Sequence, residues 1–240
     1  MIVELSTLSP DLPSRPVALI ADAHLGGPGG TGAALQEQLD ALTPDTCGLA
    51  LFMGDLFHVW VGDSRFETTT IRSFLPTLEA LRRRGVPAVY IEGNRDFFLQ
   101  HSPYVDLFDY VGLEFAFRLG TSRYLAIHGD GLNAKDRRYR FWRWLSKNRL
   151  SQTLCRMLPG SIGRRTVTWT ESQLAKTNFE HKQRVPEHII QAYGEGRLAT
   201  GHDVLLLGHF HVQRRIAVEG GEVRLLNAWY KSQQLEWLTP

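Results

Sequence analysis

Five short apolar runs, each followed directly by a polar or glycine-rich turn, constrain this sequence of 240 residues more than any other feature. Continuous apolar runs of this length are typical of strands that are buried on both faces of a sheet. Helical patterns over 33–42 and 69–84 separate some of the runs, so the sequence predicts an α/β fold, and a hairpin turn is expected at 219–222. The runs are Val17–Ala21, Leu49–Met53, Val86–Ile91, Tyr124–Ile127 and Val204–Leu207.

The polar turns carry Asp, His and Asn side chains of the kinds that bind metal ions. In α/β sheets, ligands bind beyond the carboxyl ends of the strands, and all five turns are expected at such ends. Together they offer carboxylates, imidazoles and one amide oxygen, a donor set that suits manganese, iron, zinc or a similar divalent ion. The turns are Asp22-Ala23-His24, Gly54-Asp55, Gly93-Asn94-Arg95-Asp96, His128-Gly129-Asp130 and Gly208-His209-Phe210-His211.

This set of turns predicts a centre with two metal ions. Two cations that act together lie roughly 3.5–4 Å apart and share a ligand, usually a carboxylate. Asp55 is the expected bridge, because its strand is central in the predicted order. Asp22 and His24, like His209 and His211, are two residues apart, so each pair would face one ion if its strand continued. The remaining histidines lack this setting and are expected in surface, core or supporting positions: His58, His101, His181, His188 and His202.

The segment 136–200 contains no apolar run with a polar end, and its pattern predicts helices. We interpret it as a helical cap inserted into a core formed by 1–135 and 201–240. Between Lys135 and Arg165 there are ten basic residues and a single acid, Asp136, with aromatic residues among them. A basic, aromatic stretch favours an anionic membrane surface or an acyl-chain groove. The alternatives are helices that pack their aromatics on the core, or a nucleic-acid surface.

Composition excludes several other classes of protein. The hydrophobic share of 43% and the charged share of 22% are globular values, and the net charge of +2 implies no particular partner. Cys47 and Cys155 form neither a Cys-x-x-Cys pair nor a disulfide framework, which favours a reducing compartment. No apolar run approaches the roughly 18 residues of a spanning helix, and the first residues do not resemble a signal peptide. We therefore expect a cytoplasmic protein.

These motifs, in this order, resemble those of the calcineurin-like metallophosphoesterases over the whole core. The form Gly93-Asn94-Arg95-Asp96-Phe97-Phe98 is similar to that of the UDP-2,3-diacylglucosamine hydrolases of lipid A synthesis, although Ser64, Phe210, Val212 and Gln213 depart from that family. The resemblance implies a four-layer α/β sandwich with a helical cap. It also implies cleavage of the pyrophosphate of UDP-2,3-diacylglucosamine to UMP and 2,3-diacylglucosamine 1-phosphate.

The resemblance implies roles for the residues of the turns, with two divalent ions, expected to be manganese, as cofactors. One ion would be held by Asp22, His24, Asp55 and His211, and the other by Asp55, Asn94, His128 and His209. Catalytic roles would fall to Asp55, Asn94, Arg95 and His128, and substrate contacts to Asn94, Arg95, Asp136, Tyr139 and Arg143. The implied partners are a nucleotide-diphospho-lipid and the anionic inner membrane surface, on which the protein would be peripheral, rather than nucleic acid. No oligomeric state is implied.

Arg95 gives an independent argument for an anhydride substrate. An imidazolium can protonate an alkoxide leaving group, whereas the pKa of arginine is too high for proton transfer. A guanidinium can still hold phosphate oxygens bidentately, and a pyrophosphate expels a phosphate, which needs little protonation. The alternative for Arg95 is a simple ion pair with Asp96. For the whole chain, the alternatives are another nucleotide, phosphodiester or nucleic-acid substrate, or a metal-binding scaffold without catalysis.

Overall fold

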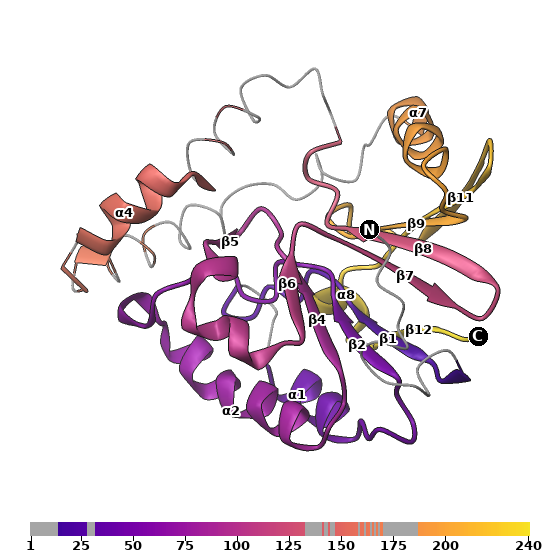
Figure 1. Ribbon diagram of the computed structural model, residues 1–240. Coiled ribbons are helices and arrows are strands. Elements are labelled where there is room, and N and C mark those ends of the chain that lie inside the picture. The colour runs from indigo at the N-terminus through magenta and orange to yellow at the C-terminus, as the bar shows by residue number, and fades with distance from the viewer. Residues whose placement is uncertain are drawn as a thin grey trace.

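Two five-stranded sheets face each other in the computed structural model (Figure 1). It describes residues 14–27, 32–132, 141, 144, 147–157, 159–160, 162–163, 165, 167, 169 and 187–240. The first sheet has the order β12-β1-β2-β4-β6 and the second has the order β10-β11-β9-β8-β7. The first comprises β1 (Val17–Ile20), β2 (Leu49–Phe52), β4 (Ala88–Ile91), β6 (Tyr110–Gly112) and β12 (Glu236–Leu238). The second comprises β7 (Glu114–Leu119), β8 (Ser122–Ile127), β9 (Val204–Leu207), β10 (Arg214–Val218) and β11 (Gly221–Leu225).

The five predicted strands are confirmed, but they divide between the two sheets. β1, β2 and β4 run parallel in the first sheet, and β8 and β9 run parallel in the second. The antiparallel strands β12, β7 and β10 complete the sheets at their edges. β2 lies between β1 and β4, which confirms the central position predicted for the strand that precedes Asp55.

Each buried strand contributes side chains to two different hydrophobic cores, one on each face of its sheet. Leu19 and Leu51 point between the two sheets, where they meet Phe117 and Leu206. Their sequence neighbours point to the opposite face of the first sheet, against the helices. Because both faces are covered, every position is apolar, and the runs show no polar alternation.

Three helices cover the outer faces of the sheets and complete four layers. α1 (Gly32–Asp40) and α2 (Thr69–Arg83) pack on the first sheet, close to the predicted bounds. The Thr68 hydroxyl caps α2 by accepting a hydrogen bond from the backbone of Ile71. α7 (Glu187–Leu198) packs on the outer face of the second sheet. The four-layer α/β sandwich that the resemblance implied is therefore confirmed.

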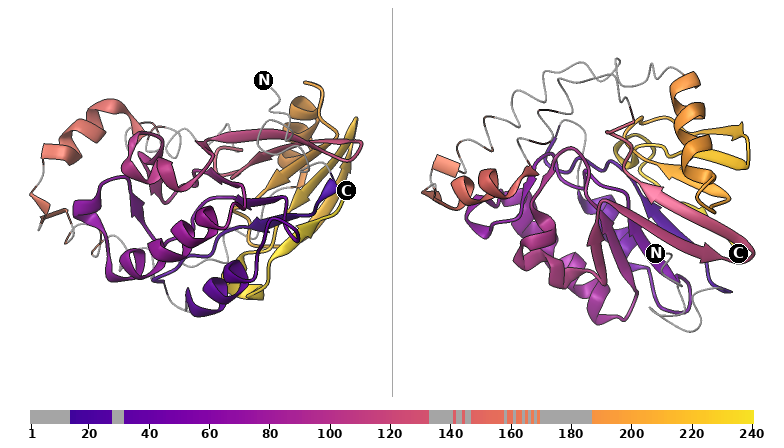
Figure 2. Two further views of the ribbon diagram at one scale, coloured as in Figure 1. Left: turned by 60° about the horizontal axis from the view of Figure 1, so that its bottom comes forward. Right: turned by 45° about the horizontal axis from the view of Figure 1, so that its top comes forward.

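Small elements lie beside the strand ends of the first sheet. β3 (Trp60–Val61) pairs with β5 (Asp96–Phe97), and the 3-10 turns η3 (Ser64–Phe66), η4 (Leu99–His101) and η5 (Pro103–Leu107) surround this pair. α4 (Arg149–Met157) packs here, because Cys155 contacts a small cluster that includes Val59 and Phe66. α4 and α7 lie at opposite ends of the molecule (Figure 2).

The segment 136–200, which the sequence predicts to be a cap, ends in α7, and this helix belongs to the layer that covers the second sheet. Ile190 and Leu198 of α7 are buried with strands β9, β10 and β11, although both fall within the range 136–200. The division of the chain into core and cap stays a prediction. Among the described residues, no helix is long and apolar enough to cross a membrane.

Candidate metal centre

The polar turns of both sheets meet at one edge of the sandwich. Asp22 and Asp55 follow neighbouring strands of the first sheet, and the backbone N–H of Asp22 donates to Gly54 O at 3.2 Å. His128 and His209 follow neighbouring strands of the second sheet. The backbone N–H of His209 donates to Asp22 Oδ2 at 2.7 Å, so this hydrogen bond links the two sheets. One carboxylate thus sits where the two sheets join.

Left-handed backbone turns aim the side chains into this space. Of the seven described non-glycine residues with positive φ, five are predicted ligands: Asp22, His24, Asp55, His209 and His211, with φ of 49°, 46°, 55°, 62° and 56°. Each such conformation costs about 1–3 kcal/mol and persists only where the surroundings impose it. The condition under which each Asp-x-His or His-x-His pair would face one ion is not met, because β1 ends at Ile20 and β9 at Leu207, before these pairs begin.

The first ligand group contains Asp22, His24 and His211, whose donor atoms lie within 4.8 Å of one another. His211 Nε2 lies 3.0 Å from Asp22 Oδ1 and 3.4 Å from His24 Nε2. All three residues are buried. Two imidazoles and one carboxylate whose donor atoms lie this close together can hold a divalent cation.

The second ligand group contains Asp22, Asp55 and His128, again within 4.8 Å. His128 Nε2 lies 3.7 Å from Asp55 Oδ2 and 3.2 Å from Asn94 Oδ1. Asp55 Oδ2 is buried and accepts no hydrogen bond from the described residues. Within the described part of the chain, this oxygen has only the more distant Arg95 guanidinium and the His128 ring near it, so it is available as a ligand, and the residues present fit a second divalent ion.

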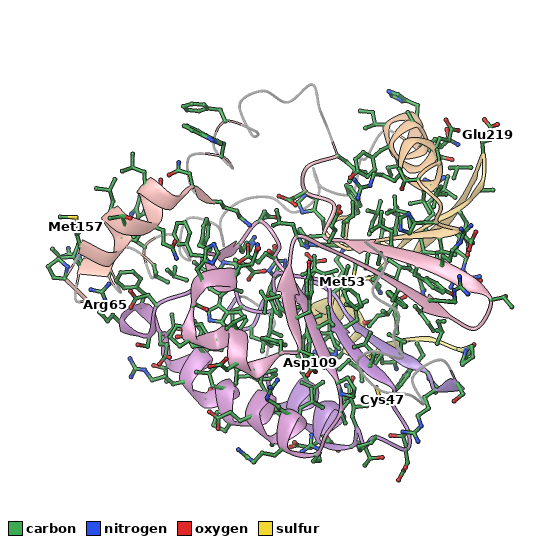
Figure 3. The ribbon with its side chains drawn as sticks, viewed as in Figure 1. Cys47, Met53, Arg65, Asp109, Met157 and Glu219 are labelled. Carbon is green, nitrogen blue, oxygen red and sulfur yellow. The ribbon has the colours of Figure 1, made fainter. Side chains whose placement is uncertain are left out.

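The His128 ring is oriented from behind by the main chain. Its Nδ1 lies 2.7 Å from the carbonyl oxygen of Met53, which ends the β2 run between the two sheets (Figure 3). A carbonyl can only accept, so Nδ1 carries the proton and Nε2 presents its lone pair to the centre. This is the arrangement that metal-binding imidazoles commonly show.

The pKa values of two buried carboxyl groups at the centre, Asp22 and Asp96, shift in opposite directions. Burial alone would raise the pKa of Asp22, but the hydrogen bond from His211 and the surrounding imidazoles outweigh burial and hold it well below its usual value. Burial and the charge of Asp55 raise the pKa of Asp96 to about 7. Asp96 accepts backbone N–H bonds from Asp55 at 2.9 Å and from Gly93 at 2.7 Å, so it fixes two of the turns to each other.

Arg95 lies inside the centre rather than in a simple pair with Asp96. Its side chain is 2% exposed, its Nε is 3.7 Å from Asp55 Oδ2, and its backbone N–H donates to Asp55 Oδ1 at 2.8 Å. One guanidinium nitrogen lies 2.9 Å from Nδ1 of His58, which is itself buried. Burial lowers the pKa of Arg95, and the charges of Asp55 and Asp22 oppose that shift.

The remaining predicted residues differ in how far the structure describes them. Asn94 joins the second ligand group through its side-chain oxygen. The His209 ring packs on that of His128, with 5.2 Å between ring centroids, and it is outside the two convergent groups. The predicted substrate contacts Asp136, Tyr139 and Arg143 lie outside the described residues.

Three further residues lie at the centre: His58, for which the sequence predicted only a surface, core or supporting position, and Tyr230 and Lys231, which it did not single out. His58 contacts Arg95, Tyr230 lies 3.2 Å from His211 Nδ1, and Lys231 donates to the carbonyl oxygen of His211 at 3.0 Å. The position of His58 directly after the Gly54–Phe57 turn was a usable signal. Tyr230 and Lys231 follow no apolar run with a polar end, and only tertiary packing brings them to the site.

Comparison with known proteins identifies the family. A family model for calcineurin-like phosphoesterases matches residues 15–213. The chain belongs to the calcineurin-like phosphoesterase family. Like other members, it is therefore a hydrolase, and its Asp and His groups form a divalent-metal centre.

Similar proteins within this family include UDP-2,3-diacylglucosamine hydrolases. Those of Yersinia pestis bv. Antiqua (strain Angola) and Yersinia pseudotuberculosis serotype O:3 (strain YPIII) are each 30% identical over 217 residues, covering 87% of this chain and 86% of theirs. Among solved structures, the phosphopantetheinyl hydrolase of Mycobacterium tuberculosis aligns with 95% of this chain and 97% of its own, at 13% identity and a TM-score of 0.46.

Proposed function

We propose that this phosphoesterase cleaves the pyrophosphate of UDP-2,3-diacylglucosamine and releases UMP and 2,3-diacylglucosamine 1-phosphate. The observation that carries the proposal is the buried guanidinium of Arg95 beside Asp55 Oδ2. A permanent cation at that point suits a substrate that is anionic on both sides of the scissile bond. The similarity to the Yersinia UDP-2,3-diacylglucosamine hydrolases supports the same substrate.

The ligand set in this proposal keeps the seven predicted residues. Asp22, His24, Asp55 and His211 would hold one ion, and Asp55, Asn94, His128 and His209 the other. The mixed nitrogen and oxygen donors suit Mn²⁺, which we propose as the native metal. When bound, the two ions lower the pKa of a water and neutralise charge on the phosphate oxygens.

The side chains around the ions favour a leaving group that needs no proton. His128 presents Nε2 to the centre and donates Nδ1–H to Met53, so its ring has no proton to give on the metal side. Arg95 stays protonated and can only donate hydrogen bonds. Asn94 adds its side-chain amide to this part of the centre. We propose that Asn94 and Arg95 together hold the phosphate groups of the substrate. Asp136, Tyr139 and Arg143 are proposed to extend these contacts to the sugar.

The comparison of two substrates tests the proposed function. With Mn²⁺ present, we expect a higher kcat/KM for UDP-2,3-diacylglucosamine than for an alkyl phosphate monoester, with UMP as the released nucleotide. A higher specificity constant for the monoester would overturn the anhydride assignment. Faster turnover of another nucleotide or of a nucleic-acid phosphodiester would keep the metal centre and replace the substrate.

We also propose that the cap contacts the lipid part of the substrate and an anionic membrane face, which makes the protein cytoplasmic and peripheral on the inner membrane. Leu150, Leu154 and Met157 lie on one exposed face of α4, and Met157 points away from the sheets (Figure 3). The other side of the helix is used for packing, since Gln152 is buried and Cys155 contacts the cluster around Phe66. Further exposed apolar side chains of the cap are Phe141, Trp144, Ile162 and Trp169.

Changing the exposed face of α4 should weaken lipid binding without unfolding the protein. The triple replacement of Leu150, Leu154 and Met157 with serine is expected to lower affinity for phosphatidylglycerol vesicles at least about tenfold, because each buried apolar side chain contributes on the order of 1.5–3 kcal/mol. Sedimentation with vesicles measures the loss. Trp237→Ser is the matched control, because Trp237 is exposed on β12. Equal losses in the two proteins would contradict the assignment.

A further inference from the structure

The short helix α8 (Trp229–Ser232) lies directly behind one ligand of the metal centre. Trp229 anchors it, since this side chain is 1% exposed and its backbone N–H donates to Ala21 O at 2.7 Å. Ala21 immediately precedes Asp22, so α8 and the first ligand turn are tied together. The next two residues, Tyr230 and Lys231, both contact His211.

The first contact concerns the ring of His211. Its Nε2 faces Asp22 Oδ1 at 3.0 Å and is therefore the atom placed to bind an ion. A neutral imidazole with one nitrogen in that role carries its proton on the other. That other nitrogen, Nδ1, lies 3.2 Å from the phenol oxygen of Tyr230. The phenol accepts the Nδ1–H bond and holds both the tautomer and the tilt of the ring.

The second contact concerns the backbone of the same residue. His211 has a φ of 56°, in the left-handed region that a residue with a side chain rarely adopts. The ammonium of Lys231 donates to the His211 carbonyl oxygen at 3.0 Å. This bond favours the turned conformation, because the carbonyl must point toward α8 to reach the ammonium.

The rings of His128 and His211 are therefore oriented by different kinds of hydrogen bond. The Nδ1 of His128 bonds to the main-chain oxygen of Met53, which no substitution removes. The Nδ1 of His211 bonds to a side chain that a single substitution removes. A role in ligand orientation can therefore be tested at Tyr230 without touching any ligand.

We propose that α8 is the positioning element of the first metal ion, with Tyr230 fixing the His211 ring and Lys231 fixing its backbone. The inference rests on the proposed metal centre and assigns a function to a segment outside the five motif turns. Tyr230 is a positioning residue here and acts on the ion only through His211. Outer partners of metal-binding histidines typically contribute about 10–100-fold to metal affinity.

Titration of Mn²⁺ into the apo full-length protein tests this role. In Tyr230→Phe, one of the two ions should bind about 10–100-fold more weakly, while the other keeps its affinity. kcat should fall at limiting Mn²⁺ and recover with excess Mn²⁺, which a general folding defect would not do. Lys231→Met keeps the aliphatic chain, removes the ammonium, and should weaken the same ion.

Tyr110→Phe is the matched control. Its hydroxyl is hydrogen-bonded too, donating to the backbone oxygen of Glu114 at 3.0 Å, and the residue lies on β6 at the edge of the first sheet, away from the ligands. This variant should bind both ions as the unmodified protein does. Unchanged affinities in Tyr230→Phe would overturn the role of α8 alone. Failure of the unmodified protein to bind two ions would instead overturn the metal centre on which the inference rests.

Discussion

Replacing Asp55 with alanine is expected to remove at least one of the two ions and to lower kcat/KM at least about 10³-fold. Asp55 Oδ2 is a buried oxygen that accepts no hydrogen bond from the described residues, and it lies 3.7 Å from His128 Nε2. A metal ion stabilises the transition state by several kcal/mol, and about 4 kcal/mol corresponds to a thousandfold change in rate. Elemental analysis after desalting, together with the rate, measures both effects.

The stability of the metal-free protein separates a lost site from a lost fold. Asp22 and Asp55 are both fully buried and share one ligand group, so without cations their charges repel each other. Asp55→Asn keeps the shape and removes one charge. We expect this variant to have a higher Tm than the unmodified apo protein and still to lack activity.

The chain supplies its own control for this experiment. Asp63 also follows a glycine, but it caps η3 and pairs with Arg65 on the surface. Asp63→Ala should keep both ions and most of the activity. Wild-type metal content and activity in Asp55→Ala would refute the assignment of Asp55 as the bridge.

Replacing Arg95 with alanine is expected to lower kcat/KM for the UDP-linked pyrophosphate about 10²–10³-fold. That range is typical when one preorganised donor to a developing charge is removed. Arg95→Lys should recover only part of the loss, because an ammonium keeps the charge but not the bidentate fork. Metal content should stay at the wild-type value in both variants, since Arg95 is not a ligand.

A second substrate shows whether Arg95 acts on the leaving phosphate. The loss in Arg95→Ala should be much smaller for an activated aryl phosphodiester, whose leaving group carries no phosphate charge. Arg83→Ala serves as the control, because Arg83 is exposed on α2 and pairs with Glu79. Equal losses on both substrates would mean that Arg95 only supports Asp55 and His58, and the argument for an anhydride would fail.

The order of strands and their polar ends could be predicted because both are local properties. A run such as Leu49–Phe52 is apolar at every position since both faces of its sheet are covered, and the turn that follows it must be polar where the strand leaves the core. The bounds of α2 and the hairpin between β10 and β11 follow from equally local signals. These patterns alone predict that Asp22, Asp55 and His128 lie at strand ends.

The local geometry of the ligands could not be predicted in the same way. The left-handed turns at Asp22, His24 and His211 are uncommon even for Asp and His, which adopt them more often than most residues, and no strand pattern predicts them. They exist because bonds from other parts of the chain hold them, such as Gly54 O to the Asp22 backbone and Lys231 to the His211 carbonyl. Strand periodicity therefore predicts which side chains stand at the strand ends, but it does not predict the backbone conformation that presents them.

The sequence by itself determined which side chains stand at strand ends, and hence the family and the metal chemistry. Only the tertiary structure decided which donor atoms of these side chains lie close to one another. Strands β8 and β9 join a second sheet, and α7 packs on the outer face of that sheet. α8 reaches His211 from beyond β11. Such contacts join segments far apart in the chain. Packing stabilises them against the entropy cost of closing the intervening loops, and no local pattern of residues encodes that balance.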